Sequence, residues 1–411
     1  MARISKMLIN EDNLHTIHTN KYKDITVSIK CAFQYDIKTK ATYKILSSML
    51  ENICLKYPTK SLMSKAKDML YGLNFGVLEH TFANFVVVNI NYNFTNPKFF
   101  NDITYDEYIN FIDETLNKPL FTEDSLIESK RNVIDEINRK LDDPSFLAFC
   151  NYKKEIAKDD SRFEALCPLS NDDINSITLN DIKLAYDNLF KTRVDVFLIG
   201  DYDNQLKDYL KKYTNSIDLH AIVYPISYGK TREVNVKKDV GQSTLIISYK
   251  SPYTKKDDDY YAVMVGNVVF GGIPSSLLFS VVREKLSLCY SIYSRSSKYE
   301  GPLHCLTNID SNNKDEALNE IRKQFSKIIH KDYDLSIVEV AKKMLLNSIS
   351  TMDDSLEYLI DYYYFGDLTN TFEDNDISAS KINNVTADDI SRVFSNFEEY
   401  IVYFLEGTLH E

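Results

Sequence analysis

Several features that would assign this chain of 411 residues to a specialised class are missing from its sequence. No apolar run approaches the roughly 18 residues that a membrane span needs, and residues 1–12 become polar too early for a signal peptide. Basic residues are not in excess, since the net charge is −12 at pH 7. That balance argues against nucleic acid and favours basic or neutral partners. We therefore expect a cytoplasmic protein that binds neither membranes nor nucleic acid.

The cysteines also lack the CxxC spacing of redox motifs and zinc knuckles. Scattered cysteines of this kind are typical of reduced thiols in a core rather than of a disulfide framework. One of them precedes a tyrosine that is discussed below, but a packing thiol is a better interpretation of it than a nucleophile. The six residues are Cys31, Cys54, Cys150, Cys167, Cys289 and Cys305.

The chain contains an internal repeat, which predicts that one fold occurs twice. Residues 177–190 are echoed by residues 385–397 at an offset of 208, and both copies begin as helices capped by threonine. Each copy leads into a strand that ends at glycine, at 194–200 and at 400–407. A chain of this length, with 44% hydrophobic residues, can hold two or more domains with sizeable cores.

Strands and paired helices interleave in each half without strict β-α alternation, a pattern typical of an α+β sandwich. In the first half, Val86, Val88, Ile90, Tyr92 and Phe94 alternate and predict a strand with one apolar face. We therefore predict two homologous α+β sandwich domains in tandem, each with a mixed, largely antiparallel sheet, at residues 1–215 and 241–411. A polar linker is expected at 216–240. Other strands are predicted at 26–33 and 243–249, and helices at 42–55, 105–117, 125–141, 260–269 and 315–329.

Residues 270–294 form the most informative run, because they predict a turn, a helix and a strand in quick succession. A tight turn is expected at Gly271 and Gly272. Pro274 suits a first helical position, and Ser275 or Ser276 can cap the helix. Alternation from residue 289 to 293 then predicts a strand.

Arg283 falls in the last turn of this helix, and Tyr290 follows seven residues later on the strand. A guanidinium offers several fixed donors and a phenol adds one more. Together they can hold a carbonyl oxygen as it gains negative charge during peptide cleavage. On the alternative interpretation, which the residue types alone favour, Arg283 pairs with a nearby acid and Tyr290 is half-buried packing.

The run resembles the C-terminal signature of the insulinase-type (M16) zinc peptidases, in which an Arg and a Tyr at this spacing hold the substrate backbone. The resemblance places these roles on Arg283 and Tyr290. Ser287 stands where the family usually has glycine, which is expected to stiffen the loop. The two-copy layout agrees with this family, whose members pair similar α+β halves around a peptide chamber. The chain resembles in particular the short, two-domain (M16B-like) bacterial members that work as unlike pairs.

The zinc motif of that family, HxxEH, is absent from the sequence. In the motif, two His residues four apart share a helix face and the Glu between them activates water. The resemblance aligns it with residues 44–50, which puts Lys44 and Ser48 at the His positions and Ser47 at the Glu position. The third ligand of the family falls on Glu128. One carboxylate alone will not hold zinc, so we expect a degenerate metal site and no metal in this chain.

Two further questions concern this region. One hypothesis is that Lys44 replaces the metal charge and pairs with Glu128, and the alternative is two exposed charges on separate helices. His15 and His18 are the histidines closest in sequence. They lie in a predicted strand, where HxxH spacing puts them on opposite faces, so no metal role is expected there.

The resemblance implies a non-catalytic, substrate-binding subunit of a heterodimeric zinc endopeptidase, cytoplasmic and bacterial. Its partner would be an HxxEH-containing M16-type subunit that supplies the zinc, while Arg283 and Tyr290 hold the peptide. No catalytic residue and no cofactor are expected in this chain. A peptidase-fold scaffold or assembly protein is the first alternative. An independent hydrolase is the second, although no Ser/His/Asp or Cys/His spacing stands out.

Overall fold

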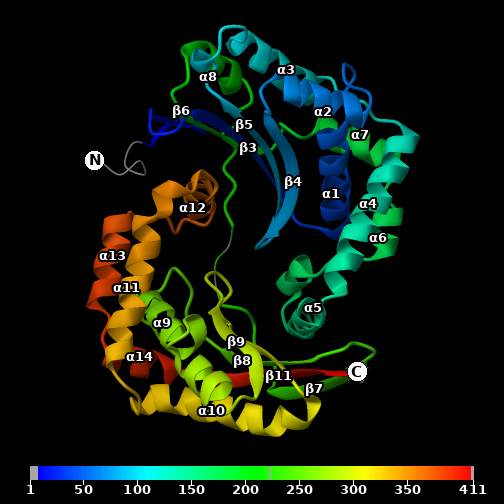
Figure 1. The fold of residues 1–411 in the computed structure, drawn as a ribbon. Coiled ribbons are helices and arrows are strands. Elements are labelled where there is room, and N and C mark those ends of the chain that lie inside the picture. Colours follow the sequence, from blue (N-terminus) through cyan, green and yellow to red (C-terminus); the bar gives the residue numbers. More distant parts are fainter. Residues whose placement is uncertain (1–7, 222, 224, 409–411) are drawn as a thin grey trace. The chain divides into compact units, whose positions relative to one another are not determined.

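A computed structural model describes residues 8–221, 223 and 225–408 of the chain. These residues form two compact units, each a layer of helices on a sheet, which confirms the predicted α+β fold (Figure 1). The first unit comprises the chain up to residue 137 together with 168–221 and 353–368. The second comprises 138–167, 222–352 and the chain from 369 onward. Each unit therefore includes one segment from the other half of the sequence.

The first unit is built on a mostly antiparallel sheet with the strand order β1-β2-β6-β3-β5-β4 among the described residues. Its central strand β3 is antiparallel to both neighbours, β5 and β6, and β2 runs parallel to β6. The apolar face predicted for the strand at 84–94 is confirmed, since its alternate side chains are buried in the core, namely Val86, Val88, Ile90, Tyr92 and Phe94. The strands are β1 (Ile9–Glu11), β2 (Leu14–His18), β3 (Asp24–Gln34), β4 (Asn74–Phe82), β5 (Phe85–Thr95) and β6 (Arg193–Gly200).

Helices cover the core face of this sheet, and local capping fixes where several of them begin (Figure 1). Asp36 accepts a hydrogen bond from the Thr39 backbone at the start of α1, and Thr104 and Thr178 form capping boxes at α3 and α7. The helices of this unit are α1 (Ile37–Asn52), α2 (Lys60–Met69), α3 (Tyr105–Asn117), α4 (Glu123–Leu141), α6 (Asn171–Asn175), α7 (Leu179–Asp187), α8 (Asn204–Lys211) and, on the opposite face, α12 (Leu356–Leu368).

The second unit repeats this plan on a sheet with the order β7-β11-β8-β10-β9. Strand β7 lies inside the segment expected to be a linker, where Val234 and Val236 pack against the core and alternate with polar residues. The strands are β7 (Arg232–Lys238), β8 (Ser243–Lys250), β9 (Cys289–Ser296), β10 (Leu303–Ile309) and β11 (Glu398–Gly407). The helices are α5 (Pro144–Ala157), α9 (Tyr260–Asn267), α10 (Lys314–His330), α11 (Ser336–Ser350), α13 (Asn375–Asn384) and α14 (Ala387–Phe394), with π-helical turns η4 (Val268–Gly272) and η5 (Phe279–Lys285).

Each sheet has one helix on its other face, and the two helices are exchanged between the halves of the sequence. Helix α5 follows α4 in the first half but packs on the second sheet, and α12 follows α11 in the second half but belongs to the first unit. Each places one fully buried tyrosine at its centre, Tyr152 on α5 and Tyr364 on α12. The repeat seen in the sequence therefore includes a pair of equivalent helices with exchanged positions.

A buried charge fixes α12 on the first sheet. The ammonium of Lys30, on β3, is 1% exposed and lies 2.9 Å from a carboxylate oxygen of Asp361 on α12. It also lies over the rings of Tyr364 and Phe365, at 5.2 and 5.9 Å from their centroids. Burial lowers the pKa of Lys30, and the nearby Asp361 carboxylate counteracts part of that effect. The docking of α12 thus depends on an ion pair whose ammonium is buried and whose carboxylate is partly exposed.

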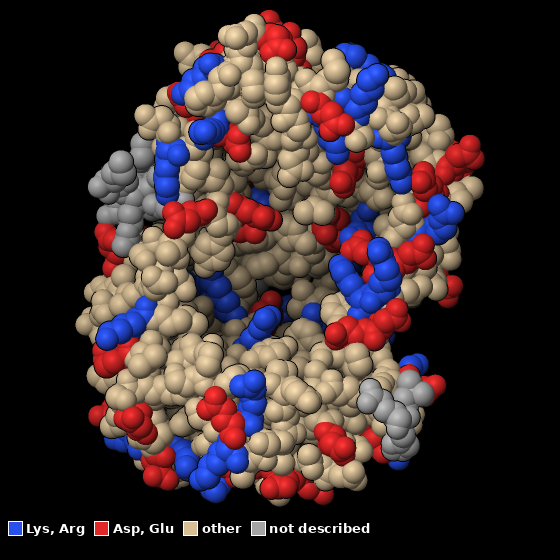
Figure 2. Space-filling view, in the orientation of Figure 1, with Lys and Arg blue, Asp and Glu red and all other residues tan. Residues whose placement is uncertain are grey.

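The exposed surface carries both signs of charge. On the face shown in Figure 2, acidic and basic side chains are interspersed rather than gathered by sign. Among the described residues, no helix is both long and apolar enough to cross a bilayer.

We predict that Asp361→Asn destabilises the chain by about 1–3 kcal/mol, because it leaves the Lys30 ammonium buried without its carboxylate. The estimate is below the roughly 3–5 kcal/mol of a fully buried pair, since Asp361 is 39% exposed. Urea unfolding of the two proteins measures the difference. The double variant Lys30→Met with Asp361→Asn should recover most of the loss. Equal stability of Asp361→Asn and the native chain would contradict the role given to the pair.

A second prediction concerns acid stability. Burial lowers the pKa of His304 from 6.5 to about 3, and its ring lies 4.9 Å from Phe149 of α5. Below pH 6.5 the unfolded state binds a proton at His304 and the folded state does not. The native chain therefore loses stability as the pH falls from 6.5 toward 3. The stability advantage of His304→Phe over the native chain should therefore grow by up to about 1.4 kcal/mol per pH unit. Parallel curves of unfolding free energy against pH for the two proteins would refute the prediction.

Candidate functional site

The run at residues 270–294 folds into the end of η4, a turn, a helix that becomes π-helical, and a strand; the turn expected at Gly271 and Gly272 lies at 273–276 instead, because both glycines belong to η4. The helix begins at Leu277, and the Ser276 hydroxyl accepts a weak hydrogen bond from the Phe279 backbone at 3.4 Å, so the predicted cap is confirmed. The prediction for Pro274 is wrong, because this residue lies in the preceding turn, which the Ser276 N–H closes on the Ile273 carbonyl at 3.0 Å. Arg283 lies in the last turn of η5, and the predicted strand is β9.

Arg283 and Tyr290 are brought together by this turn. The Arg283 Nε donates a hydrogen bond of 2.8 Å to the backbone carbonyl of Tyr290, and the guanidinium lies 4.4 Å from the centroid of the Phe279 ring. In the part of the chain that the structure describes, no carboxylate lies within ion-pair distance of Arg283. Tyr290 is 87% exposed. The alternative interpretation, an acid-paired arginine and a half-buried tyrosine, therefore does not hold.

A left-handed residue closes the turn between them. Ser287 has φ 53°, a conformation that glycine adopts without strain and that other residues adopt at a cost. The backbone N–H groups of its neighbours Leu286 and Leu288 bond back to the carbonyls of Val281 and Val282, each at 3.0 Å. This explains why glycine suits the position, and it shows that serine takes up the same backbone shape here. π-Helical turns of this kind are frequent at functional sites.

An open cavity of about 880 Å³ lies beside the pair, at the end of the second sheet. Its volume is in the range typical of ligand sites. The lining is mixed in charge, since Arg283 faces the same space as Glu284 and Asp310. Other lining residues come from strand ends and loops, among them Ser243, Cys289, Tyr290, Asn308 and Gly407. The exposed phenol and the guanidinium thus border a space large enough for a peptide segment.

Cys289 lines this cavity but is a poor nucleophile. Burial raises the pKa of its thiol, so the reactive thiolate is disfavoured at neutral pH. All six cysteines are free thiols, as the sequence predicts, and all except Cys289 are buried. The packing interpretation of this residue is the better one.

The degenerate metal site lies on α1 and α4. Lys44 lies 3.3 Å from Glu136, and Glu128 lies 2.8 Å from Lys60, so each charge has a partner other than the one expected. The hydrogen bond from Lys60 also lowers the pKa of Glu128. The expected Lys44–Glu128 pair is therefore not formed, because nearer opposite charges on α2 and α4 neutralise both side chains.

The residues present at this place do not fit a zinc ion. Ser47 is buried with a hydroxyl that lacks a hydrogen-bond partner, and Ser48 offers only another hydroxyl. An ammonium, two hydroxyls and one carboxylate engaged by Lys60 do not make a ligand set for zinc. Among residues 8–221, 223 and 225–408, no group of three His, Cys, Asp or Glu side chains is arranged to hold a metal ion.

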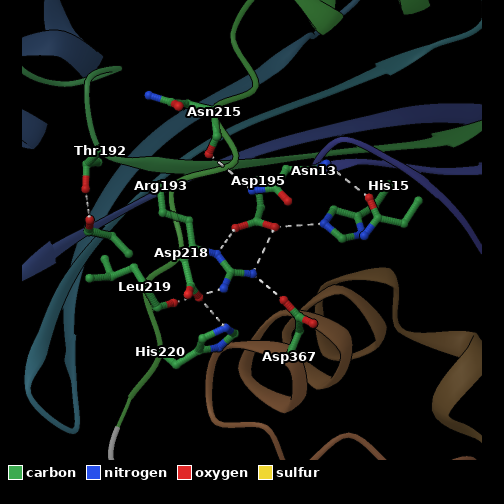
Figure 3. Close-up of polar contacts among 12 residues, drawn as sticks. Asn13, His15, Thr192, Arg193, Asp195, Asn215, Asp218, Leu219, His220 and Asp367 are labelled. Atoms are coloured by element: carbon green, nitrogen blue, oxygen red, sulfur yellow. Dashed lines mark hydrogen bonds and ion pairs between the residues drawn. The ribbon is translucent and has the colours of Figure 1, made fainter.

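The histidine pair at the N-terminus divides between two environments. His15 is buried and His18 is exposed at the end of β2, so the strand and its opposite faces are confirmed. The His15 Nε2 lies 2.8 Å from Asp195 (Figure 3). Its ring stacks on Phe197 with 4.4 Å between the ring centroids. His18 lies 3.4 Å from Asp201 instead. His15 is part of a buried ion network.

Sequence reasoning missed the rest of this network. Arg193 donates to Asp195 at 2.8 Å, to the Leu219 carbonyl at 3.0 Å, and to Asp367 of α12 (Figure 3). Burial opposes the ionisation of Asp195, but the hydrogen bonds from His15 and Arg193 outweigh it and lower the pKa. The signal in the sequence was the pair of charges at alternate positions of an otherwise apolar strand. This network holds α12 in place and presents no open site.

Comparison with known proteins supports the resemblance. Residues 176–345 match the family described as peptidase M16 inactive domain. A "Probable inactive metalloprotease YmfF" of Bacillus subtilis is 24% identical over 96% of this chain and 95% of its own length. A "Non-peptidase homolog YmxG" of Helicobacter pylori is 26% identical over 64% of this chain and 63% of its own length.

Solved structures share the fold over nearly the whole chain. A conserved protein of Enterococcus faecalis superposes with a TM-score of 0.86 at 23% identity and covers 97% of both chains. A peptidase M16 inactive domain protein of Pseudomonas fluorescens superposes with a TM-score of 0.78 at 15% identity and covers 98% of both chains. The chain is thus similar to the peptidase M16 inactive domain family over residues 176–345, and across nearly its whole length it has the fold of M16-like peptidases.

Proposed function

We propose that this chain is the non-catalytic, substrate-binding subunit of a heterodimeric zinc endopeptidase. The observation that carries the proposal is the contrast between its two motif positions. Arg283 and Tyr290 form an open pair beside a cavity, while Lys44, Ser47 and Ser48 offer no ligand set for zinc. A chain that can hold a peptide but not a hydrolytic metal suits a role beside a subunit with HxxEH.

The geometry of the pair suits a peptide backbone. The Nε of Arg283 is engaged by the Tyr290 carbonyl, which fixes the guanidinium plane and leaves its terminal N–H groups for a ligand. The exposed phenol adds a hydroxyl donor a short distance along the chain. Donors held in this way stabilise a carbonyl oxygen most when it becomes negative in the transition state. Their role is to hold and polarise the substrate, and the partner performs the hydrolysis.

The partner in this proposal is an M16-type subunit with HxxEH that supplies the zinc, in a bacterial cytoplasm. The support for an inactive chain is the degenerate site together with the names of relatives, one called a probable inactive metalloprotease and one a non-peptidase homologue. The relatives compared here come from bacteria. A scaffold without a role in proteolysis would keep the same fold, and the following experiment separates the two functions.

We predict that Tyr290→Phe lowers the turnover of the complex by roughly tenfold to a thousandfold, the range for losing one oxyanion donor. The measurement is cleavage of a quenched fluorescent peptide by this chain co-expressed with an HxxEH-containing M16-type subunit, with and without a chelator. Tyr358→Phe is the matched control, because Tyr358 is an exposed tyrosine outside the cavity lining. If both variants turn over substrate like the native complex, the chain is a scaffold.

A further prediction concerns Ser287. Since its backbone is left-handed, Ser287→Gly should stabilise the chain by up to about 1 kcal/mol. Ser287→Val should destabilise it, because a β-branched residue is strongly disfavoured at positive φ. Thermal unfolding of the three proteins gives the order, expected to be Gly, then Ser, then Val. A valine variant as stable as the glycine variant would show that the turn is not constrained.

A further inference from the structure

A second cavity, of about 380 Å³, lies within the first unit between α12 and the strands β3, β4 and β5. Its floor is the polar face of the sheet, opposite the apolar core. The register of the strands arranges this floor in cross-strand rows: Thr26, Asn93 and Asn74; then Ser28, Asn91 and Gly76; then Lys30, Asn89 and Leu78. A floor of amides and hydroxyls offers both donors and acceptors to a polar ligand.

Part of this polar floor is already satisfied and part is not. Asn89 accepts from the Ser28 hydroxyl at 2.8 Å, and Asn93 donates to Thr26 at 2.9 Å. Asn74 and Asn91 line the same cavity without a side-chain hydrogen bond to any described residue. Their amide groups are thus available to a molecule that enters.

Gly76 is the register partner of Asn91 and has open space beside it. A Cβ built at this position meets no atom within 4 Å, and the backbone has no positive φ that would require glycine. Glycine inside a strand weakens the strand and often marks a place where a ligand approaches closely. Neither packing nor backbone conformation accounts for glycine here, so its missing side chain enlarges the groove.

The charges at the groove favour a cation. Three carboxyl groups, those of Glu51, Glu357 and Asp361, face one ammonium, that of Lys30, which Asp361 already neutralises. Glu357 is exposed and forms no ion pair within 4 Å among the described residues, and the cation its charge acts on, Lys30, is already paired with Asp361. Burial raises the pKa of Glu51, so an approaching cation would stabilise its ionised form. Leu78 and Leu356 add apolar walls along which an aliphatic stem can lie.

We propose that this groove, lined by Asn74, Asn91 and Glu357, is a subsite for one basic side chain, lysine or arginine, of a bound peptide. The stem packs against the two leucines, the head pairs with Glu357, and the amide oxygens accept from its N–H groups. The inference rests on the proposed function, because it assumes that the chain binds peptides. It adds a preference for one class of side chain.

The test uses three acetylated and amidated nine-residue peptides of alanine and serine that differ only at the central residue. The residue is arginine, the neutral isostere citrulline, or glutamate, and binding to the full chain is measured by isothermal titration calorimetry. We expect the arginine peptide to bind roughly five- to tenfold more tightly than the citrulline peptide, and the glutamate peptide to bind most weakly. The preference should shrink as the salt concentration rises.

Variants locate the effect. Glu357→Gln should remove most of the preference for arginine over citrulline. Asp172→Asn, which makes the same charge change at an exposed residue of α6 outside the groove, should leave it intact. Gly76→Leu should fill the open space and weaken the arginine peptide without unfolding the chain, as checked by circular dichroism.

Equal affinity for arginine and citrulline, or a preference that survives both Glu357→Gln and Gly76→Leu, would overturn the proposal. So would the failure of all three peptides to bind. The proposed function has its own readout, the turnover of the complex with Tyr290→Phe. If the chain shows no preference for the arginine peptide but Tyr290→Phe still lowers turnover, the groove proposal is wrong and the proposed function stands.

Discussion

The first unit depends on burying charge between β-strands and a helix that arrives late in the sequence. Lys30 and Arg193 stand on the polar face of the sheet; Asp361 of α12 pairs with Lys30, and Asp367 of α12 adds a second carboxylate to Arg193, which Asp195 of its own strand also holds. Buried pairs of this kind contribute little net stability, because desolvation offsets much of the attraction. They do penalise any arrangement that leaves one member alone. The position of α12 is therefore set by charge matching as much as by the burial of Tyr364.

The second unit meets the same structural need mainly with apolar side chains, and its charge pair Arg232–Asp159, at 2.6 Å, lies just beyond the end of α5. Its sheet receives α5 through Tyr152, Ile156 and neighbouring apolar residues, with His304 against Phe149. The two equivalent helices therefore suit different surfaces. α5 presents Phe149, Tyr152 and Ile156 to its sheet, whereas α12 presents Asp361 and Asp367 to Lys30 and Arg193, so exchanging the two helices would leave these cations without those carboxylates. Such mismatch works against the wrong pairing of helix and sheet.

The sequence allowed the fold class, the repeat and most elements to be predicted, because these follow from local periodicity. The strand at residues 84–94 and the helix at 105–117 are found almost residue for residue, since alternation and a capping box are local signals. The exchange of α5 and α12 has no local signal. It arises from long-range packing, so interpretation by consecutive segments does not find it. Strand β7 was missed because its polar alternate residues resemble a linker.

At the candidate site, Arg283 and Tyr290 could be predicted as a pair, and the exposure of the phenol could not. The direction of a side chain at the start of an edge strand depends on the turn before it, here on the left-handed Ser287. The partners of Lys44 and Glu128 were also beyond prediction, because they depend on which of several charges on α2 and α4 lie nearest. Pairing among surface charges is weakly specified by sequence.

The exchange of α12 also constrains the order of events during synthesis on the ribosome. The strands of the first sheet are complete by residue 200, but the helix that covers their polar face begins only at Leu356. At about 5–20 residues per second, translation needs on the order of ten to thirty seconds to cross that interval. Through this period the ammonium of Lys30 lacks its carboxylate on α12 and water must solvate it, and a hydrated, charged face is a poor surface for association with other nascent chains. The residues that later hold α12 thus keep the unfinished sheet apart from its neighbours.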